Sequence, residues 1–511
     1  VYGAYIWDAK ANRWQQLATS GAMPEADRVQ DGIAQGVYAV AVAPTKPDRI
    51  FMAVKGTVYR SDDRGATFEA AQSGPFPLHW DANSTWRFAG AFLVVDPNNP
   101  DVVMLGTPGD GVLRSSDAGR TWQRVAGIPA NKDRSPEAGV QAPGTPIWFE
   151  SGADGKATGR ILAFAQGIGM YASNNNGVSF QPIEASGAHP TMINRGGFAR
   201  NGVFFAADTE GQAVWALENG RWRNLVQEGS LRALGYGSIA VDPRTDRVLA
   251  LDQGGQGYLS ADGGKSWSSV TKSASIGAGD PPWLKIADHD FFATGSVMFD
   301  PAKPDRLWVA HGVGVFYADL VGGDTHLSWI SQARGIEEIV ANDVVQTKGH
   351  APLFAGWDFG IHIKQDLNGY STRFSPNRGF IAVQQMDWTP ADPSFLVTNA
   401  SDTRECCSED GNAVMAGYST DAGNTWTKFA SLPTPPGTKE DDPWRMSFGT
   451  IAVSSTDPDN IVWAPANNRA PFFTKDRGKT WEQVILPGAT GDTYGSFRNS
   501  WYQRKTLTAD K

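Results

Sequence analysis

Short apolar segments alternate with polar turns along the whole chain, and this alternation predicts many short β-strands. The apolar segments Ile50–Val54, Val102–Leu105 and Leu307–Ala310 each follow a proline-containing loop. That loop reads roughly apolar-x-D-P-x-x-P-D-R-apolar, and its copies are Ala43–Ile50, Val95–Val102, Val241–Val248, Phe299–Leu307 and Ser455–Ile461. Runs of this length, bounded by Pro, Gly and Asp, indicate strands joined by tight connections.

A second pattern, S/T-x-D/N-x-G-x-T/S-W/F, occurs six times and is the motif called the Asp-box. Its copies are Ser61–Phe68, Ser115–Trp122, Ser173–Phe180, Ser260–Trp267, Ser419–Trp426 and Thr474–Trp481. We expect a hairpin turn in which the Asp accepts backbone N–H groups, the Gly takes a positive φ and the aromatic ring packs beneath. The carboxylates of Asp63, Asp117, Asp262, Asp421 and Asp476 are therefore interpreted as structural, since the motif specifies a fold and hardly any chemistry.

The two patterns combine into one repeating unit: strand, proline loop, strand, short turn, strand, Asp-box, strand. A four-stranded unit of this kind is the blade of a β-propeller. The N-terminus fits the end of one more blade, with Ala4–Trp7 and Trp14–Leu17 as its third and fourth strands. Seven units precede about residue 340 and three follow. We predict an all-β chain of tandem seven-bladed propellers, residues 1–340 and 341–511, with the second incomplete in this chain; a single ten-bladed ring is the alternative.

Composition excludes several classes of function. The chain has 511 residues, 41% of them hydrophobic, and a net charge of -9, which argues against nucleic acid as a partner. No apolar run approaches membrane-spanning length, so we expect a soluble chain without a membrane partner. The two cysteines, Cys406 and Cys407, are adjacent, and free thiols are the favoured interpretation. We expect no cofactor, no metal and a monomer.

One turn carries a candidate catalytic acid. In Leu353–Asn368, Asp358 lies between Trp357 and Phe359, and Gly356 and Gly360 give the backbone freedom for a sharp reversal. Partial desolvation between two rings would raise the pKa of this carboxyl, and the rings offer faces to a sugar. Asp110, Asp208 and Asp252 occupy equivalent turns, where turn-capping carboxylates are the favoured interpretation, and Asp8 is interpreted as a strand-end residue.

Three segments resemble glycoside hydrolase family 74, the xyloglucanases and related β-glucanases. The first lies at the N-terminus and consists of Gly3–Tyr5, Trp7-Asp8 and Asn12–Trp14. The second is Val94–Val125, and the third is Ala355–Leu367. The resemblance implies two seven-bladed propellers in tandem, a substrate cleft between them and inverting hydrolysis by two aspartates. One of these corresponds to Asp358. The other corresponds to the position immediately before Val1, so the chain as given is expected to lack one catalytic Asp. Tyr2, Trp357 and Phe359 depart from the residues usual in the family.

The predicted function is hydrolysis of β-1,4-glucan backbones, with xyloglucan as the first substrate. Aromatic residues suited to stacking on sugar rings are Trp80, Trp86, Trp283, Trp357, Trp444, Trp501, Tyr2 and Tyr5. Lys285, Asp288 and His289 form a polar loop that could bind hydroxyl groups, and His362 is interpreted as a packed or orienting side chain. Alternatives are a non-catalytic, sortilin-like binding propeller and, ranked lower, a sialidase, for which no arginine triad is visible. The substrate class implies secretion, either extracellular or periplasmic.

Overall fold

The computed structural model describes the chain from residue 4 to residue 487, with gaps. The described residues are 4–17, 37–54, 56–76, 78, 88–130, 143–152, 156–184, 187–288, 292–337, 339–357, 359–375, 383–400, 416–441, 446, 449–465, 469–485 and 487. They form two units. Unit 1 comprises Val1–Asp280 and Leu284–Ile336, and unit 2 comprises Pro281–Trp283 and Glu337–Lys511. The alternative of a single ten-bladed ring is therefore not realised.

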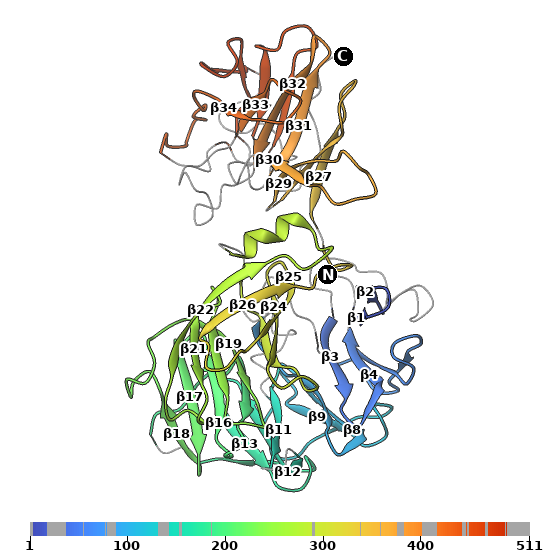
Figure 1. The fold of residues 1–511 in the computed structure, drawn as a ribbon, viewed down its shortest axis with the longest axis vertical. Helices are drawn as coiled ribbons and strands as arrows, with labels where there is room; N and C mark the ends of the chain where they lie inside the picture. The colour runs from blue at the N-terminus through green and yellow to red at the C-terminus, as the bar shows by residue number, and fades with distance from the viewer. Residues whose placement is uncertain are drawn as a thin grey trace. The chain divides into compact units, whose positions relative to one another are not determined.

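Unit 1 contains a two-stranded hairpin and six four-stranded antiparallel arrangements (Figure 1). The hairpin is β1 (Tyr5–Asp8) with β2 (Arg13–Gln16). The first three sheets are β3 (Val37–Ala43), β4 (Lys46–Val54), β5 (Thr57–Ser61), β6 (Glu69–Ala70); β7 (Leu93–Asp96), β8 (Asn99–Gly106), β9 (Val112–Ser115), β10 (Gln123–Arg124); β11 (Ile147–Ser151), β12 (Ala157–Ala165), β13 (Gly169–Ser173), β14 (Gln181–Pro182). The next three are β15 (Arg195–Phe198), β16 (Phe204–Asp208), β17 (Ala213–Glu218), β18 (Arg221–Asn224); β19 (Tyr236–Val241), β20 (Val248–Asp252), β21 (Gly257–Ser260), β22 (Ser268–Ser275); β23 (Ser296–Phe299), β24 (Arg306–His311), β25 (Gly314–Asp319), β26 (His326–Ser331). A parallel pairing of β22 with β26 joins the last two into one eight-stranded sheet.

The first strands of these sheets contact one another in chain order, from β3 through β7, β11, β15 and β19 to β23. The N-terminal hairpin lies between the two ends of this series. On one side, Ala4 and Leu17 pack with Ile50 and Met52 of the first sheet. On the other, the Trp14 N–H donates to the Arg334 carbonyl at 2.7 Å, just beyond β26. The strands predicted for the N-terminus therefore close unit 1 into a ring.

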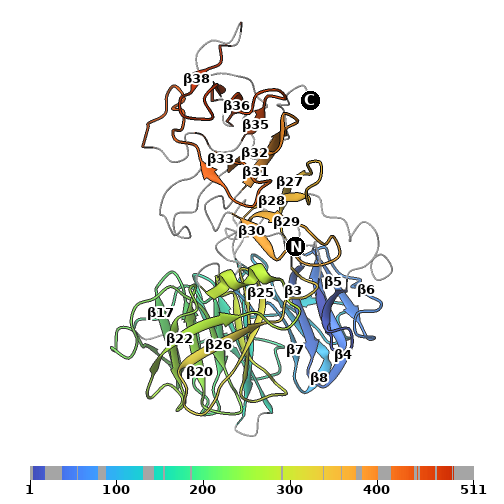
Figure 2. The ribbon, with the colours of Figure 1, turned by 45° about the horizontal axis from the view of Figure 1, so that its top comes forward.

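Unit 2 contains three further four-stranded antiparallel sheets (Figure 2). They are β27 (Ala341–Val345), β28 (Leu353–Gly356), β29 (Gly360–Ile363), β30 (Arg373–Ser375); β31 (Val383–Thr389), β32 (Asp392–Ala400), β33 (Ala416–Ser419), β34 (Thr427–Lys428); β35 (Thr450–Val453), β36 (Ile461–Ala464), β37 (Phe472–Thr474), β38 (Glu482–Gln483). In most of these sheets the second strand is buried over most of its length, as in Val102–Leu105 and Ile161–Ala165. Apolar side chains on both faces of such strands fill the layers between neighbouring sheets. The all-β propeller class predicted from the sequence is confirmed.

The Asp-box turns have the predicted hydrogen bonds. In the first copy, Asp63 accepts the Thr67 N–H at 2.9 Å and the Thr67 hydroxyl at 2.6 Å, and the Ser61 hydroxyl at 2.7 Å. These hydrogen bonds to its charged form lower the pKa of the Asp63 carboxyl. Gly65 has the expected positive φ of 86°. The residue before it, Arg64, also has a positive φ of 60°, and its N–H donates to the Asp48 carbonyl of the proline loop.

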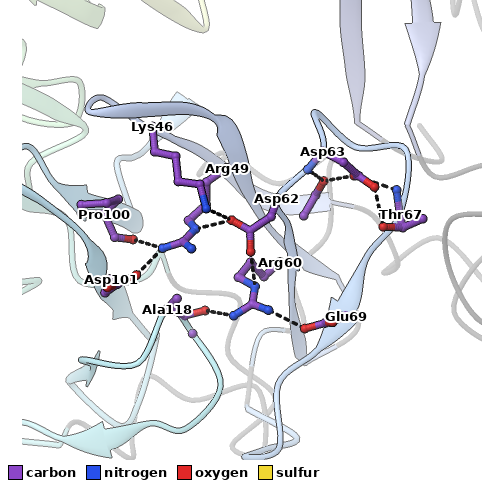
Figure 3. A network of polar contacts seen from close by, with 12 residues as sticks. Lys46, Arg49, Arg60, Asp62, Asp63, Thr67, Glu69, Pro100, Asp101 and Ala118 are labelled. Atoms are coloured by element: carbon purple, nitrogen blue, oxygen red, sulfur yellow. Dashed lines mark hydrogen bonds and ion pairs between the residues drawn. The ribbon is translucent and has the colours of Figure 1, made fainter.

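Arginines of the proline loops connect neighbouring sheets, which the sequence pattern did not predict (Figure 3). Arg49 on β4 donates to Asp62 of its own sheet at 2.6 Å, and to Asp101 and the Pro100 carbonyl of the next. Arg247 repeats the arrangement later in unit 1, where it donates to Asp305 at 2.9 Å and to the Pro304 carbonyl. The Pro-Asp pair of one loop is thus bound by the arginine of the preceding blade.

Between β22 and β23, the described part of the chain forms the 3-10 helix η4 (Pro282–Asp288). Within the described part of the chain, no helix has the length and hydropathy required to span a membrane. The same residues contain no group of three or more His, Cys, Asp or Glu side chains placed to hold a metal ion.

Candidate functional site

The turn that carries the candidate acid connects β28 to β29 in unit 2. Gly356 and Gly360 pair directly across its base. Gly360 has a φ of 75°, and a Cβ at Gly356 would lie 2.8 Å from Ile339 Cγ2, so both positions require glycine. Asp358 itself lies outside the described residues. Its neighbour Trp357 is half-buried. The backbone N–H of Trp357 donates to the Val340 carbonyl at 3.0 Å, and its Nε1–H donates to Gln384 at 3.3 Å.

A hollow of about 190 Å³ lies beside this turn. Its walls are mostly apolar, and they include Trp283, Ile339, Phe354, Gly356, His362 and Lys364. Concave apolar walls with a few polar groups are typical of ligand sites, although this volume is below the roughly 300–1,000 Å³ of a site for a drug-sized molecule. The hollow formed by these residues of unit 2 is therefore large enough for only part of a drug-sized ligand.

Aromatic rings hold one wall of the hollow in place. Trp283 meets the His362 ring edge-on, with centroids 5.3 Å apart, and the Tyr370 ring edge-on at 5.5 Å. The Tyr370 hydroxyl donates to Glu337. Edge-to-face aromatic pairs at such distances add about 0.5–1.5 kcal/mol each beyond the area they bury. Trp283, His362, Tyr370 and Glu337 are called the aromatic stack below.

His362 is buried, with 3% of its surface exposed, and burial lowers its pKa to about 4. The Phe359 backbone acts in the opposite direction, and the Lys364 charge adds to the lowering. The imidazole is consequently neutral at neutral and mildly acidic pH. This environment fits the interpretation of His362 as a packed or orienting residue.

The rival acids in unit 1 lie in turns, and two of them accept backbone N–H groups. Asp208 accepts the Gly211 N–H at 2.8 Å, and Asp252 accepts the Gln256 N–H at 2.9 Å. Burial raises the pKa of both carboxyls, although these N–H bonds oppose the rise. At Asp110 the backbone N–H donates to the Thr107 hydroxyl. Asp8 accepts the N–H groups of the two residues that follow β1.

The predicted substrate-binding residues are dispersed, and many lie outside the described part of the chain. Trp283 lines the hollow but has only 8% of its surface exposed, and Tyr5 is half-buried in β1 of unit 1. Asp288 accepts the Ala274 N–H at 2.8 Å and so attaches the end of η4 to β22, while Lys285 is exposed. The predicted residues outside the described part are Tyr2, Trp80, Trp86, His289, Asp358, Cys406, Cys407, Trp444 and Trp501.

The aromatic stack is the part of the site that sequence reasoning missed as a group. Tyr370 and Glu337 are 33 residues apart, and Trp283 comes from a separate segment between β22 and β23. No local spacing links these residues. The sole sequence signal for this group was the position of His362, four residues after Asp358.

Comparisons with known proteins agree on one class. No protein-family model matches the chain. A xyloglucanase from Paenibacillus sp is 27% identical over 548 residues, which cover 94% of this chain and 50% of that protein. The oligoxyloglucan-reducing end-specific xyloglucanase of Emericella nidulans is 26% identical over 640 residues. The aligned region covers 98% of this chain and 73% of that protein. The crystal structure of a GH74 xyloglucanase from Xanthomonas campestris superposes with a TM-score of 0.73 at 27% identity, over 95% of this chain and 71% of that one.

The fold and these similarities place the chain among propeller proteins related to glycoside hydrolases. The resemblance to glycoside hydrolase family 74 that was inferred from Gly3–Asp8 and Ala355–Leu367 is confirmed. The chain spans about half the length of the Paenibacillus relative, and larger shares of the others.

Proposed function

We propose that this chain is part of a glycoside hydrolase that cleaves the β-1,4-glucan backbone of xyloglucan. The observation that carries the proposal is similarity to xyloglucanases over 94% or more of the chain. The substrate is a neutral polysaccharide, and the protein acts outside the cytoplasm as a monomer. Unit 1 serves as the N-terminal propeller, within residues 1–340, and unit 2 supplies the first blades of a second propeller, within 341–511.

The proposed mechanism is inverting hydrolysis by two carboxyl groups. One protonates the leaving oxygen while the other activates water on the opposite face of the sugar, and the two are roughly 6.5–9.5 Å apart. Asp358 is assigned the role of general base by analogy with the family. The general acid corresponds to the position immediately before Val1.

The surroundings of the acid-bearing turn support this role. Its base is fixed by two obligatory glycines, and its flank by Trp357, whose backbone and indole N–H groups both have acceptors. The neutral His362 adds no positive charge beside the turn. A turn fixed at its base and flank in this way would present a general base with little reorganisation when a sugar ring arrives.

The test is release of reducing sugar from xyloglucan and from mixed-linkage glucan, with a chain extended at both ends by its natural sequence. We expect the extended protein to cut xyloglucan, and Asp358→Asn to lower kcat by roughly 10²–10⁴-fold with little change in KM. A folded extended protein that cuts neither glucan would reject the hydrolase assignment. Binding of xyloglucan without cleavage would then assign a non-catalytic binding propeller.

A further inference from the structure

Arg195 is the first residue of β15 in unit 1, where it pairs with Ala207 near the end of β16. This edge of the sheet also carries the turn between its second and third strands. The side chain is partly buried, and its Nε donates to the Phe88 carbonyl at 2.9 Å. Phe88 precedes the second sheet, so Arg195 reaches a segment two sheets earlier in the ring.

The segment 88–91 passes across three sheets at this edge. The Gly90 N–H donates to the Asn194 carbonyl at 2.9 Å, and the Ile147 N–H donates to the Ala91 carbonyl at 3.0 Å. A Cβ at Gly90 would lie 2.8 Å from Arg195 Nη1 and 2.9 Å from Cζ. The guanidinium therefore lies directly against Gly90, at a distance that any side chain there would prevent.

The charge of Arg195 lacks a carboxylate among the described residues. Three other arginines of unit 1 have one: Arg49 pairs with Asp62, Arg247 with Asp242, and Arg334 with Asp280. Asp208, next to the strand partner of Arg195, is instead bound to the Gly211 N–H. Burial alone lowers the pKa of Arg195 to about 10, which still leaves the guanidinium charged at neutral pH.

We propose that the guanidinium of Arg195, held in place by the Phe88 carbonyl and packed against Gly90, is a binding site for a small oxyanion, a carboxylate or a phosphate. Because Nε is already bonded to Phe88, the Nη1–Nη2 edge is the edge that remains for two parallel N–H···O bonds. A guanidinium recognises carboxylate and phosphate in this bidentate manner. A neutral glucan has no anionic group that could neutralise this charge, so we expect the ligand of this site to differ from the proposed substrate.

The test is isothermal titration of the full chain with inorganic phosphate, acetate and galacturonate at constant ionic strength. We expect at least one to bind the natural protein, and binding to weaken by about tenfold or more in Arg195→Met, the loss expected for hydrogen bonds to a charged group. Phosphate binding alone would identify a phosphate site, and binding of acetate or galacturonate a carboxylate site. Arg200→Met is the matched control, because Arg200 is exposed just beyond the same strand.

A second variant keeps the test valid if Arg195→Met does not fold. Gly90→Ala retains the charge but displaces the guanidinium, and it should also weaken binding by about tenfold. The proposal is overturned if none of the three anions binds. Equal binding by the natural protein, Arg195→Met and Gly90→Ala would overturn it too, since the anion would then lie elsewhere.

Discussion

The turn between the second and third strands differs between the two units, although the blade is the same. In unit 1 the acids of these turns, Asp208 and Asp252, are occupied by backbone N–H groups. In unit 2 the β28–β29 turn is flanked by Trp357, has Gly356 and Gly360 paired at its base, and borders a hollow lined by part of the aromatic stack. A carboxylate that caps its own turn contributes to the stability of that turn. The apolar hollow distinguishes the turn of unit 2 and supports the proposal that the catalytic acid lies there.

The largest expected effect comes from breaking the aromatic stack. Trp283→Ala removes a buried ring that contacts both His362 and Tyr370, and truncation of a buried Trp costs about 3–5 kcal/mol. We expect the loss in the unfolding transition of unit 2, measured by calorimetry with hydrogen exchange to assign the unit. Trp222→Ala, a buried Trp in unit 1, is the matched control and should destabilise unit 1 instead. A loss in unit 1 caused by Trp283→Ala would contradict this account.

A smaller effect on stability is expected when the arginine that forms ion pairs with two neighbouring blades of unit 1 is replaced. Arg49→Met leaves Asp62 and Asp101 without their shared cation, at a cost of about 2 kcal/mol because both carboxylates are partly solvated. Burial alone would raise the pKa of Asp62, but Arg49 and Lys46 more than offset it and hold the pKa at about 2.

The same variant should alter acid stability. A depressed folded-state pKa adds stability above the unfolded value, roughly 3.9, which is lost as pH falls toward 2. Denaturant unfolding of Arg49→Met should therefore show a smaller loss between pH 4 and pH 2 than the natural protein. Arg120→Met, an exposed arginine, is the control. If the free energy of unfolding of Arg49→Met and of the natural protein fell equally between pH 4 and pH 2, the role assigned to the Arg49 ion pairs would be contradicted.

The smallest effect is the pH dependence that His362 gives to unit 2. Its folded pKa of about 4 is below the ordinary histidine value of 6.5, so the folded state binds fewer protons between these values. Stability should therefore rise with pH from about 4 to 6.5, by at most roughly 1.4 kcal/mol per pH unit. His362→Phe should flatten this rise in calorimetry, whereas His350→Phe, at an exposed position of the same unit, should not. An unchanged slope in His362→Phe would show that other groups cause it.

The elements that could be predicted are those fixed by local interactions. The hydrogen bonds that Ser61 and Asp63 make to form the first Asp-box turn lie within residues Ser61–Phe68, so the eight-residue pattern specifies the turn. The N-terminal hairpin was also predictable, because its strands pair across a short turn.

The remaining features depend on residues that are distant in the sequence. Arg49 and Asp101 are 52 residues apart, and Arg195 and Phe88 are 107 apart. The same is true of the aromatic stack, since Trp283 comes from a segment far from His362. Such contacts arise from the order of sheets around the ring, which the spacing of a single motif does not encode. For Asp358, the sequence and the family resemblance remain the basis of its assignment.

The most direct test of the difference between the two turns is the kcat/KM for xyloglucan of three matched variants. Asp358→Asn, Asp208→Asn and Asp252→Asn would be made in the same extended chain, and their folding checked by circular dichroism. We predict a loss of roughly 10²–10⁴-fold for Asp358→Asn and near-natural activity for the two unit-1 variants. A comparable loss in Asp208→Asn or Asp252→Asn, with activity retained in Asp358→Asn, would place the chemistry in unit 1 and contradict the account.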